Sequence, residues 1–315
     1  MFVNNLTNSS LIVRAAEWHI AGHGVALAFV IRTWGSSPRP VGSVMIIRDD
    51  ILVEGSVSGG CVEGMVIEAG SDAIKTGKGK RLDFGVADET AWEVGLSCGG
   101  QIAVLVSPIG PDGIKPKILA NIAADLRARR PATLCLNAAS GKLAQPLSSS
   151  IPTASRLDEK SMLFYLVQPP GRRLVIIGGV HISQFLAPMA NFVGYDVTII
   201  DPRSVFTLAE RFPEINCVTA WPDEAMRTLK PDSRTAIVAL AHDPKIDDPG
   251  LQVGLASDAF YIACLGSDRT HAARCARLQE AGFNKVDLQR LNGPAGLNIH
   301  ALTPAEIAVS ILAEM

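Results

Sequence analysis

Long apolar segments alternate with polar, glycine-rich segments in the first half of the chain. Residues 24–34 (GVALAFVIRTW) are almost continuously apolar and rich in β-branched side chains, which predicts a buried strand. Two shorter apolar segments flank Asp49 and Asp50, which predicts a hairpin that turns at these two acids. The remaining apolar spacing predicts helices over residues 10–23, 61–75 and 117–130, and strands over residues 101–109, 132–137 and 162–168.

In the second half, short apolar runs alternate regularly with segments of helical spacing. The runs begin with LVIIG at residue 174 and continue with DVTIID, CVTAW, TAIVAL and FYIACLG. Strands that alternate with helices predict a parallel sheet with helices on both faces. The predicted fold class is therefore α/β, with an N-terminal mixed α+β domain followed by a Rossmann-like, doubly wound parallel-sheet domain.

The segment QPPGRR (168–173) separates the two halves. Its two prolines and its glycine end one folded unit and lead into the first apolar run of the next. We therefore predict an N-terminal domain over residues 1–168, which contains two glycine-rich cysteine loops, and a C-terminal domain over residues 171–315. A length of 315 residues agrees with two domains.

The composition narrows the function classes. Hydrophobic residues make up 48% and charged residues 19%, which is typical of a globular protein. The net charge of −2 and the aromatic content of 5% argue against nucleic acid as a partner, and no apolar run is long enough to cross a membrane. The N-terminal segment shows no signal-peptide pattern and the six cysteines are scattered, so we expect a cytoplasmic protein with reduced thiols.

Two of the six cysteines lie among glycines. Cys61 lies in GSVSGGCVEG (55–64), and Cys98 lies in LSCGG (96–100). Glycine packs no side chain, but it lets another group approach the backbone closely. Cys61 also begins a predicted helix, where the helix dipole and the unpaired N–H groups lower the pKa of a thiol. A thiolate of this kind can bind a soft metal or carry a persulfide, so Cys61 is the candidate persulfide carrier.

Each of these assignments has a structural alternative. A single cysteine is usually a small buried apolar residue, and this description suits the other four: Cys135, Cys217, Cys264 and Cys275. It suits Cys61 and Cys98 poorly, because both adjoin glycine. Glu63 is a candidate general acid or base, but acids in the first turn of a helix commonly stabilise that helix, and the sequence leaves both roles open.

A partial dinucleotide-binding fingerprint opens the second domain. Gly178 and Gly179 follow the first apolar run and precede a helix. Asp201 ends the next strand, where an acid can bind a ribose hydroxyl. Val180 and Ser183 stand where the fingerprint needs glycine, which weakens the case for NAD(P) or another nucleotide as a cofactor. The sequence leaves two roles open for this turn: nucleotide binding, or a tight connection between strand and helix.

Further polar residues follow the strands of the predicted parallel sheet. They are, in chain order, His181, His242, Asp243 and Ser267. Because the carboxyl ends of parallel strands share one edge, we expect these residues to lie with Asp201 at a metal, acid–base or cofactor site. The alternative is that the acids and the serine cap helices and turns.

Five sequence blocks together resemble a known family. They are TWGSSPRPVGS (33–43), GSVSGGCVEG (55–64), LSCGG (96–100), LGSDRT (265–270) and TPAEIAVSILAE (303–314). In this order, and over essentially the whole chain, they resemble the xanthine dehydrogenase accessory factors of the XdhC/CoxI type. The resemblance implies a chaperone that binds the molybdenum cofactor (molybdopterin), protects it, supports its sulfuration and delivers it to a xanthine dehydrogenase-type molybdenum hydroxylase. It also implies a cysteine desulfurase as a partner, and an accessory role rather than an enzymatic one.

The resemblance also indicates which residues would meet the cofactor. Thiolates suit a soft molybdenum–dithiolene centre, which makes Cys61 and Cys98 the expected metal ligands. The pterin phosphate needs positive charge and hydrogen-bond donors, and the expected groups are Ser36, Ser37, Arg39 and the amides of Gly59 and Gly60. Gly99 and Gly100 would complete the pocket beside Cys98.

Two other functions remain open. The first is an NAD(P)-dependent oxidoreductase that uses the C-terminal domain, which Asp201 supports and which Val180 and Ser183 weaken. The second is a cysteine persulfide sulfur transferase with Cys61 as the carrier, which overlaps with the maturation role. Most soluble oligomers are symmetric homo-oligomers, so a homodimer is the expected assembly.

Overall fold

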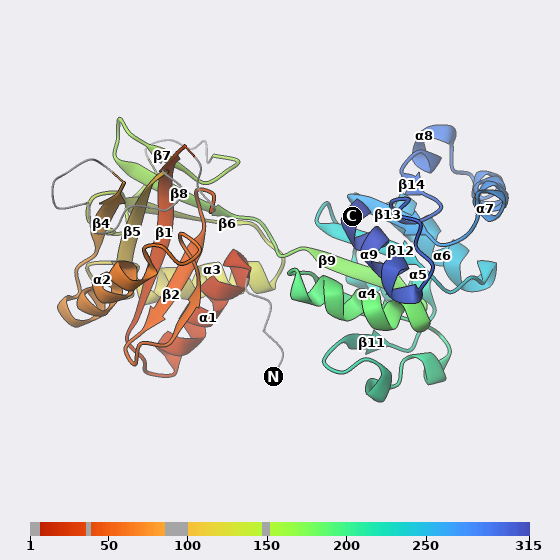
Figure 1. Ribbon diagram of the computed structural model, residues 1–315, viewed down its shortest axis with the longest axis horizontal. Coiled ribbons are helices and arrows are strands. Elements are labelled where there is room, and N and C mark those ends of the chain that lie inside the picture. The colour runs from red at the N-terminus through yellow and green to blue at the C-terminus, as the bar shows by residue number, and fades with distance from the viewer. Residues whose placement is uncertain (1–6, 36–38, 86–99, 147–151) are drawn as a thin grey trace. The chain divides into compact units, whose positions relative to one another are not determined.

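A computed structural model describes residues 7–35, 39–85, 100–146 and 152–315 (Figure 1). The chain divides into two compact units, one that ends at Pro170 and one that covers Gly171–Met315. The N-terminal unit contains two sheets and the C-terminal unit one, and each unit has its own hydrophobic clusters. Within the described residues, no helix combines the length and the apolar character that crossing a membrane requires.

The N-terminal unit is built on a five-stranded antiparallel sheet. Its spatial order is β3-β2-β1-β5-β4, so the most apolar strand, β1, lies at the centre. A second sheet of three antiparallel strands has the order β6-β8-β7. The strands are β1 (Val25–Trp34), β2 (Val44–Arg48), β3 (Val53–Gly55), β4 (Lys80–Phe84), β5 (Gln101–Pro108), β6 (Ala132–Asn137), β7 (Arg156–Asp158) and β8 (Leu163–Gln168).

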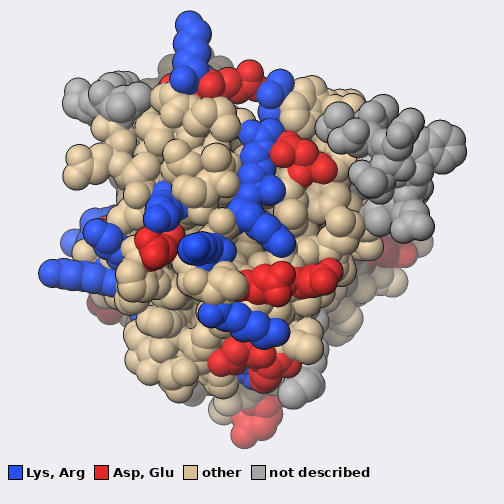
Figure 2. Space-filling model, turned by 90° about the vertical axis from the view of Figure 1, so that its left-hand side faces the viewer, with Lys and Arg blue, Asp and Glu red and all other residues tan. Residues whose placement is uncertain are grey.

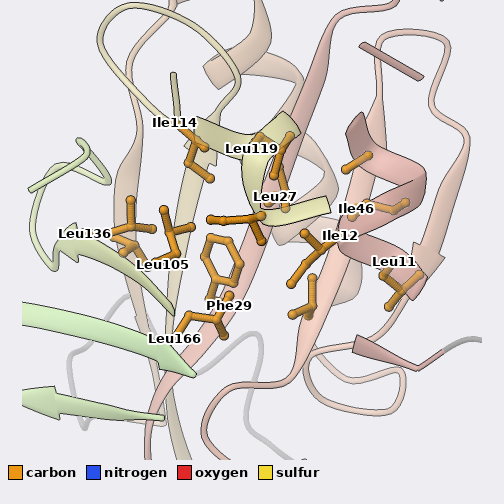
Figure 3. Close-up of a cluster of buried hydrophobic side chains, with 14 of the residues drawn as sticks. Leu11, Ile12, Leu27, Phe29, Ile46, Leu105, Ile114, Leu119, Leu136 and Leu166 are labelled. Carbon is orange, nitrogen blue, oxygen red and sulfur yellow. The ribbon is translucent and has the colours of Figure 1, made fainter. Parts of the chain in front are cut away.

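Strand β1 contributes to the core on both faces of the large sheet, because successive side chains of a strand point to opposite faces. Leu27 and Phe29 enter a cluster with two helices and the small sheet, which Figure 3 shows. Ala26 and Ala28 enter a second cluster on the other face, together with residues of the third helix. The helices on the first face are α1 (Asn8–Ile20) and α3 (Pro116–Arg127), and the helix on the second face is α2 (Glu63–Thr76).

Charged side chains of both signs share the surface. Figure 2 shows one face of the molecule, on which lysine and arginine side chains lie beside aspartate and glutamate side chains. Ion pairs of this kind in the N-terminal unit include Arg81 with Asp83 and Arg48 with Asp50, each with an N–O distance of 2.6 Å. Water and salt screen such exposed pairs, so the fold rests on its apolar clusters rather than on its surface charges.

The C-terminal unit contains a six-stranded sheet in which all neighbouring strands are parallel. Its spatial order is β11-β10-β9-β12-β13-β14. The order reverses between β9 and β12, the position at which doubly wound sheets usually bind ligands. The strands are β9 (Arg173–Ile177), β10 (Asp196–Ile200), β11 (Asn216–Val218), β12 (Thr235–Ala239), β13 (Tyr261–Cys264) and β14 (Leu291–Asn292).

Helices cover both faces of this parallel sheet. Leu186 of α4 and Ile311 of α9 pack on one face, and Met226 of α5 and Leu251 of α6 pack on the other. The helices are α4 (His181–Phe192), α5 (Pro222–Leu229), α6 (Pro244–Leu255), α7 (Asp268–Glu280), α8 (Lys285–Leu288) and α9 (Pro304–Glu314). Two 3₁₀ turns, η2 (Ser204–Phe206) and η3 (Ala209–Arg211), follow β10.

This architecture confirms the predicted fold class, both for the mixed N-terminal unit and for the Rossmann-like parallel sheet. Strands β4 and β7 were not predicted, because both are short, carry charged residues and lie at sheet edges. The helix expected from residue 61 begins at Glu63 instead. The reason is that Glu63 draws the preceding residues into a hydrogen-bonded loop.

Candidate functional site

The loop between β3 and α2 carries Cys61. It begins at Gly55, where a Cβ would overlap the carbonyl oxygen of Val44, so only glycine fits. Gly59 and Gly60 follow with φ values of +83° and +123°, both in the region that favours glycine. These glycines let the chain fold back toward the start of α2.

The carboxylate of Glu63 organises this loop. Its Oε1 accepts hydrogen bonds from the hydroxyl of Ser56 (2.6 Å) and from the N–H groups of Ser58 (2.9 Å) and Gly59 (3.0 Å). Its Oε2 accepts hydrogen bonds from the hydroxyl of Ser58 (2.5 Å) and from the N–H of Gly60 (2.8 Å). Donors from residues 56–60 thus converge on one side chain.

This environment makes Glu63 a poor proton donor at neutral pH. Burial raises the pKa of Glu63, but the hydrogen bonds from Ser56, Ser58 and Gly60 outweigh burial and lower the pKa to about 2. A carboxyl group with this pKa is ionised at pH 7, and both of its oxygens already have partners. Of the two roles that the sequence leaves open for Glu63, the geometry favours the structural one.

The Cys61 side chain is exposed, and Cys61 lies two positions before the first residue of α2. Its N–H donates to the hydroxyl oxygen of Ser58 at 3.0 Å, so the serine that binds Glu63 also holds the backbone of Cys61. Among the described residues other than its two chain neighbours, no atom lies within 4 Å of a Cβ placed on the preceding Gly60. The loop therefore presents a thiol where a soft metal or a sulfur donor can reach it.

Part of the expected cofactor site lies outside the described residues: Ser36, Ser37, Cys98 and Gly99. Their described neighbours lie close together, since a Cβ on Gly35 would be 3.7 Å from the Cα of Gly100. The pairing of Trp34 with Gln101 explains this proximity, because it places the end of β1 beside the start of β5.

A hydrophobic cluster links the Cys61 loop to the described residues that flank segment 86–99. Val57 and Val62, on either side of Cys61, belong to the same buried cluster as Phe84 and Ile102. Phe84 ends β4, and Ile102 is the second residue of β5. The described ends of the segment that contains Cys98 therefore share a core with the loop of Cys61.

Two of the groups expected to bind the pterin phosphate form hydrogen bonds within the protein instead. The N–H groups of Gly59 and Gly60 donate to Glu63, so they are used within the protein rather than directed to a ligand. The sequence shows that an acid follows these glycines, but it does not show that the acid folds back onto them. Arg39 is half-buried, and Gly100 is buried immediately before β5.

Protein atoms close the glycine turn after β9 on both sides. A Cβ on Gly178, which has a φ of +101°, would lie 2.7 Å from the backbone nitrogen of Ala241. A Cβ on Gly179 would overlap the carbonyl group of Phe206. Ser183, at the third position of the fingerprint, donates its hydroxyl hydrogen to the carbonyl oxygen of Gly178 at 2.6 Å. The geometry therefore favours a tight connection between strand and helix over nucleotide binding.

Asp201 is completely buried beyond the end of β10, and its carboxylate already has several donors. It accepts hydrogen bonds from the N–H of Gly179 (3.0 Å), the N–H of Arg203 (3.0 Å) and the guanidinium of Arg203 (2.9 and 2.8 Å). Burial raises the pKa of Asp201, but the bonds from Arg203 and Gly179 outweigh burial and hold the pKa below its usual value. Arg203 thus takes the hydrogen bonds that a ribose hydroxyl would need.

Two further residues expected at this edge cap helices. Asp243 precedes α6 and accepts a hydrogen bond from the N–H of Lys245 at 2.9 Å. Ser267 precedes α7 and accepts a hydrogen bond from the N–H of Thr270 at 3.3 Å. Both arrangements match the capping role that the sequence left open for them.

The two histidines at this edge are exposed and do not join a ligand set. His181 is the first residue of α4, and its ring centroid lies 5.4 Å from that of Phe185. His242 has a φ of +60°, and partial burial, with the charge of Arg274, lowers its pKa. Across the part of the chain that the structure describes, no group of three or more His, Cys, Asp or Glu side chains could hold a metal ion. The described geometry therefore does not bring the named residues together as a metal site.

Sequence reasoning missed a buried pair of opposite charges beside this edge. Asp247 of α6 and Arg274 of α7 are 1% and 2% exposed, and 3.9 Å separates the carboxylate from the guanidinium. Burial raises the pKa of Asp247 to about 6, although the charge of Arg274 opposes the shift. Asp247 lies in a short charged stretch with Lys245 and Asp248, and Arg274 lies in a helix rich in charged residues. Such segments resemble solvent-facing surfaces in a sequence. No local pattern therefore distinguishes them.

The two units match two protein-family models. The family described as the XdhC Rossmann domain matches residues 174–315, and the XdhC and CoxI family matches residues 18–85. Together these matches cover two thirds of the chain.

Similar proteins align over nearly the whole chain. The molybdenum cofactor insertion chaperone PaoD of Escherichia coli (strain K12) is 28% identical over 302 residues, which covers 96% of this chain and 85% of PaoD. A probable xanthine dehydrogenase subunit of Bacillus subtilis (strain 168) is 26% identical over 311 residues, which covers 92% of this chain and 91% of that protein. A crystal structure of a xanthine dehydrogenase from Bacillus halodurans has a TM-score of 0.78 at 22% identity and covers 98% of this chain and 94% of its own. This last likeness shows the fold alone.

Proposed function

Because the chain belongs to the XdhC and CoxI family, we propose that it is a molybdenum cofactor insertion chaperone for a xanthine dehydrogenase-type molybdenum enzyme. The similarity to PaoD over most of both chains supports this role. The observation that carries the proposal is the exposed Cys61 thiol, held on a loop that the Glu63 carboxylate braces. The role is accessory rather than enzymatic.

The donor set at this loop fits a soft metal centre. Cys61 offers a thiolate ligand, and none of the described residues beyond the chain neighbours of Gly60 lies within 4 Å of the Cβ position of that adjacent glycine. When bound, the cofactor would supply a redox-active molybdenum–dithiolene centre. Cys98 is the proposed second ligand, because the described ends of its segment share a cluster with the Cys61 loop.

The proposed phosphate contacts come from the other glycine-rich segment. Ser36, Ser37 and Arg39 supply hydroxyl donors and a positive charge, and Gly99 and Gly100 border Cys98 in the sequence. The amides of Gly59 and Gly60 hold Glu63 instead, so they position the loop without touching the ligand.

We assign the finer steps of maturation to the same loop. The chain protects the cofactor, receives sulfur from a cysteine desulfurase with Cys61 as the persulfide carrier, and delivers the sulfurated cofactor to its client enzyme. It acts in the cytoplasm as a homodimer. The exposure of Cys61 supports the sulfur step, because thiol–persulfide exchange needs an accessible nucleophile.

Co-purified molybdopterin tests this function. The cofactor, converted by oxidation to its fluorescent derivatives, is measured in the parent and in the Cys61→Ala, Cys98→Ala and Cys217→Ala variants. Each of the first two variants is expected to bind at least about tenfold more weakly, which corresponds to about 1.4 kcal/mol. Cys217 lies in the other unit and provides the matched control. Parent-like binding by both of the first two variants would show that the thiol assignment is wrong.

A further inference from the structure

A second arrangement of thiols lies in the C-terminal unit, away from the Cys61 loop. Cys264 is the last residue of β13, and His271 and Cys275 lie one turn apart on α7. The imidazole of His271 lies between the two sulfur atoms. Its Nδ1 is 3.7 Å from the Sγ of Cys264, and its Nε2 is 3.5 Å from the Sγ of Cys275.

The surrounding hydrogen bonds define which nitrogen of His271 can accept a proton. Cys264 is completely buried, and its thiol donates to the carbonyl oxygen of Asn292 at 3.6 Å. The sulfur of Cys264 therefore faces Nδ1 as an acceptor, which assigns the ring hydrogen to Nδ1. Nε2 is then the basic nitrogen, and it faces Cys275.

Burial keeps this group in the required protonation states. Burial, followed by the charge of Arg274, lowers the pKa of His271, so the ring is neutral at pH 7 and can accept a proton. Burial raises the pKa of Cys264 to about 11, so this residue remains a thiol and orients the ring without reacting. Cys275 is half-buried, so it is the partly exposed residue of the two cysteines.

The backbone at Gly293 leaves room for the imidazole of His271. A Cβ on Gly293 would overlap the ring of His271, so the glycine makes room for the histidine to reach Cys264. Arg274, between His271 and Cys275 in the helix, is only 2% exposed. Its Nη2 donates to the carbonyl oxygen of Leu265 at 3.1 Å, whereas its Nε and Nη1 have no hydrogen-bond partner among the described residues. A buried cation with unused donors is suited to an anionic group.

We propose that Cys275 and His271 form a nucleophile–base pair that accepts a sulfane sulfur from a persulfide, with Cys264 as the residue that orients the base. The choice of sulfur as the transferred group rests on the proposed maturation function. The nucleophile, the base and the orienting group follow from the geometry alone.

The transfer conserves electrons and protons. Nε2 of His271 takes the proton of the Cys275 thiol, and the resulting thiolate attacks the outer sulfur of the persulfide R–S–SH. The Sγ–S bond forms as the S–S bond of the donor breaks, and the bonding electron pair leaves with the donor sulfur. The imidazolium returns the proton to that sulfur, which gives Cys275 persulfide and R–SH. One sulfur atom moves, and no external oxidant or reductant takes part.

The protein contains an internal control for this reaction. Cys217 is half-buried like Cys275, but it lies in β11 opposite Ile199 of β10 rather than beside an imidazole. The full-length protein is incubated with glutathione persulfide, and peptide mass spectrometry follows the added sulfur on both cysteines. Cys275 is expected to react at least about tenfold faster than Cys217, since a positioned base accelerates proton transfer by roughly 10²–10⁴-fold.

Substitutions distinguish the role of the base, His271, from that of the orienting residue, Cys264. His271→Asn and His271→Gln are expected to slow the reaction of Cys275 by roughly 10²-fold and to move its rate profile toward higher pH. Cys264→Ser keeps an acceptor at Nδ1 and is expected to preserve the profile, whereas Cys264→Ala is expected to shift it. In the parent protein, a rate profile for Cys275 that coincides with that of Cys217 overturns the proposal without any variant. Unchanged Cys275 rates in both His271 variants overturn it as well.

The test of Cys275 can be distinguished from the test of cofactor binding at Cys61. His271→Asn is expected to hold molybdopterin as the parent does, because the residue lies in the other unit from Cys61. Loss of reactivity at Cys275 with intact cofactor binding would remove only the second site. Loss of cofactor binding in the Cys61→Ala variant, with parent rates at Cys275, is the pattern expected when both assignments hold.

Discussion

The N–H of Gly60 donates to the carboxylate of Glu63 at 2.8 Å, so the residue before Cys61 is tied to the first residue of the helix after it. This bond fixes Cys61 from both sides along the chain. The loop thus depends on one partly buried carboxylate close to it in the chain, and changing Glu63 measures how much this carboxylate stabilises the loop.

Replacing Glu63 by glutamine is expected to destabilise the N-terminal unit by roughly 2–3 kcal/mol, because an amide NH₂ would face backbone donors that now bind an oxygen. Chemical unfolding, with hydrogen exchange of residues 57–62 as a local probe, provides the measurement. Glu68→Gln, at an exposed position of the same helix, is the control and is expected to change stability by less than about 0.5 kcal/mol. Equal effects of the two substitutions would contradict the assigned role.

Low pH is expected to destabilise the loop of residues 55–63. The folded pKa of Glu63 is about 2, below the usual value of about 4.3, so its ionised form stabilises the fold at pH values above the usual pKa. This contribution is lost as the pH falls through about 4 toward 2, and we expect a loss of about 1–2 kcal/mol after screening by solvent. Unfolding experiments at a series of pH values should show this dependence in the parent and not in Glu63→Gln.

Asp247 is expected to show the opposite dependence. Its folded pKa of about 6 lies above the usual value of about 3.9, so its contribution is fully present below pH 4 and is lost as the pH rises through 6. Between pH 4 and pH 7, the parent is expected to lose roughly 1–3 kcal/mol more stability than Asp247→Asn. Hydrogen exchange of the β12 amides reports on this unit, and Asp258→Asn, at an exposed position, is the control. Parallel pH profiles for the parent and Asp247→Asn would rule out this account.

A methyl group at position 179 is expected to disturb the turn after β9. Gly179→Ala places a Cβ against the carbonyl group of Phe206, and we expect a loss of about 2–3 kcal/mol in thermal or urea unfolding. Gly171→Ala, where a Cβ would meet no described atom within 4 Å, is expected to remain within about 0.5 kcal/mol of the parent. A neutral Gly179→Ala would mean that the turn has room for a ligand after all.

Nicotinamide dinucleotides are expected not to bind. Titration with NADH or NADPH to about 1 mM should give no saturable heat, because Arg203 and Gly179 already hold the Asp201 carboxylate. The informative opposite result is saturable binding that disappears in Asp201→Asn. That outcome would support an oxidoreductase function for the C-terminal unit.

The elements that could be predicted are those whose pattern is local. The continuous apolar sequence of β1 predicts a central strand because both of its faces are buried, as Leu27 and Ala28 show. The edge strand β4 has no such pattern, since Lys80 is exposed and Leu82 is only partly buried. Burial on one side at an edge leaves too weak a signal in five residues.

The site residues were harder to interpret, because a residue type does not reveal its partner. Glu63 and Asp201 were both recognised as acids at functional positions. Backbone N–H groups, which have no signature in the sequence, donate most of the hydrogen bonds to Glu63 and half of those to Asp201. The pairing of Asp247 with Arg274 joins two helices that are far apart in the chain, so it depends on tertiary structure. The same holds for Cys264 and Cys275, which the sequence assigns to packing and the fold brings to opposite sides of one imidazole.

Every hydrogen bond that the Glu63 carboxylate accepts from the described residues comes from a residue one to seven positions before it in the chain. A ring closed over so few residues loses little chain entropy, so the turn can form without waiting for distant strands to pair. We therefore expect the hydrogen-bonded turn of residues 56–63 to form early in folding, before Val57 and Val62 pack against the sheet. A ligand would then bind to a turn that is already formed, which limits the conformational entropy that the loop loses on binding. Because its hydrogen bonds are local, the turn can also be transferred. Inserted between the end of a strand and the start of a helix in another protein, it is expected to expose its cysteine in the same way.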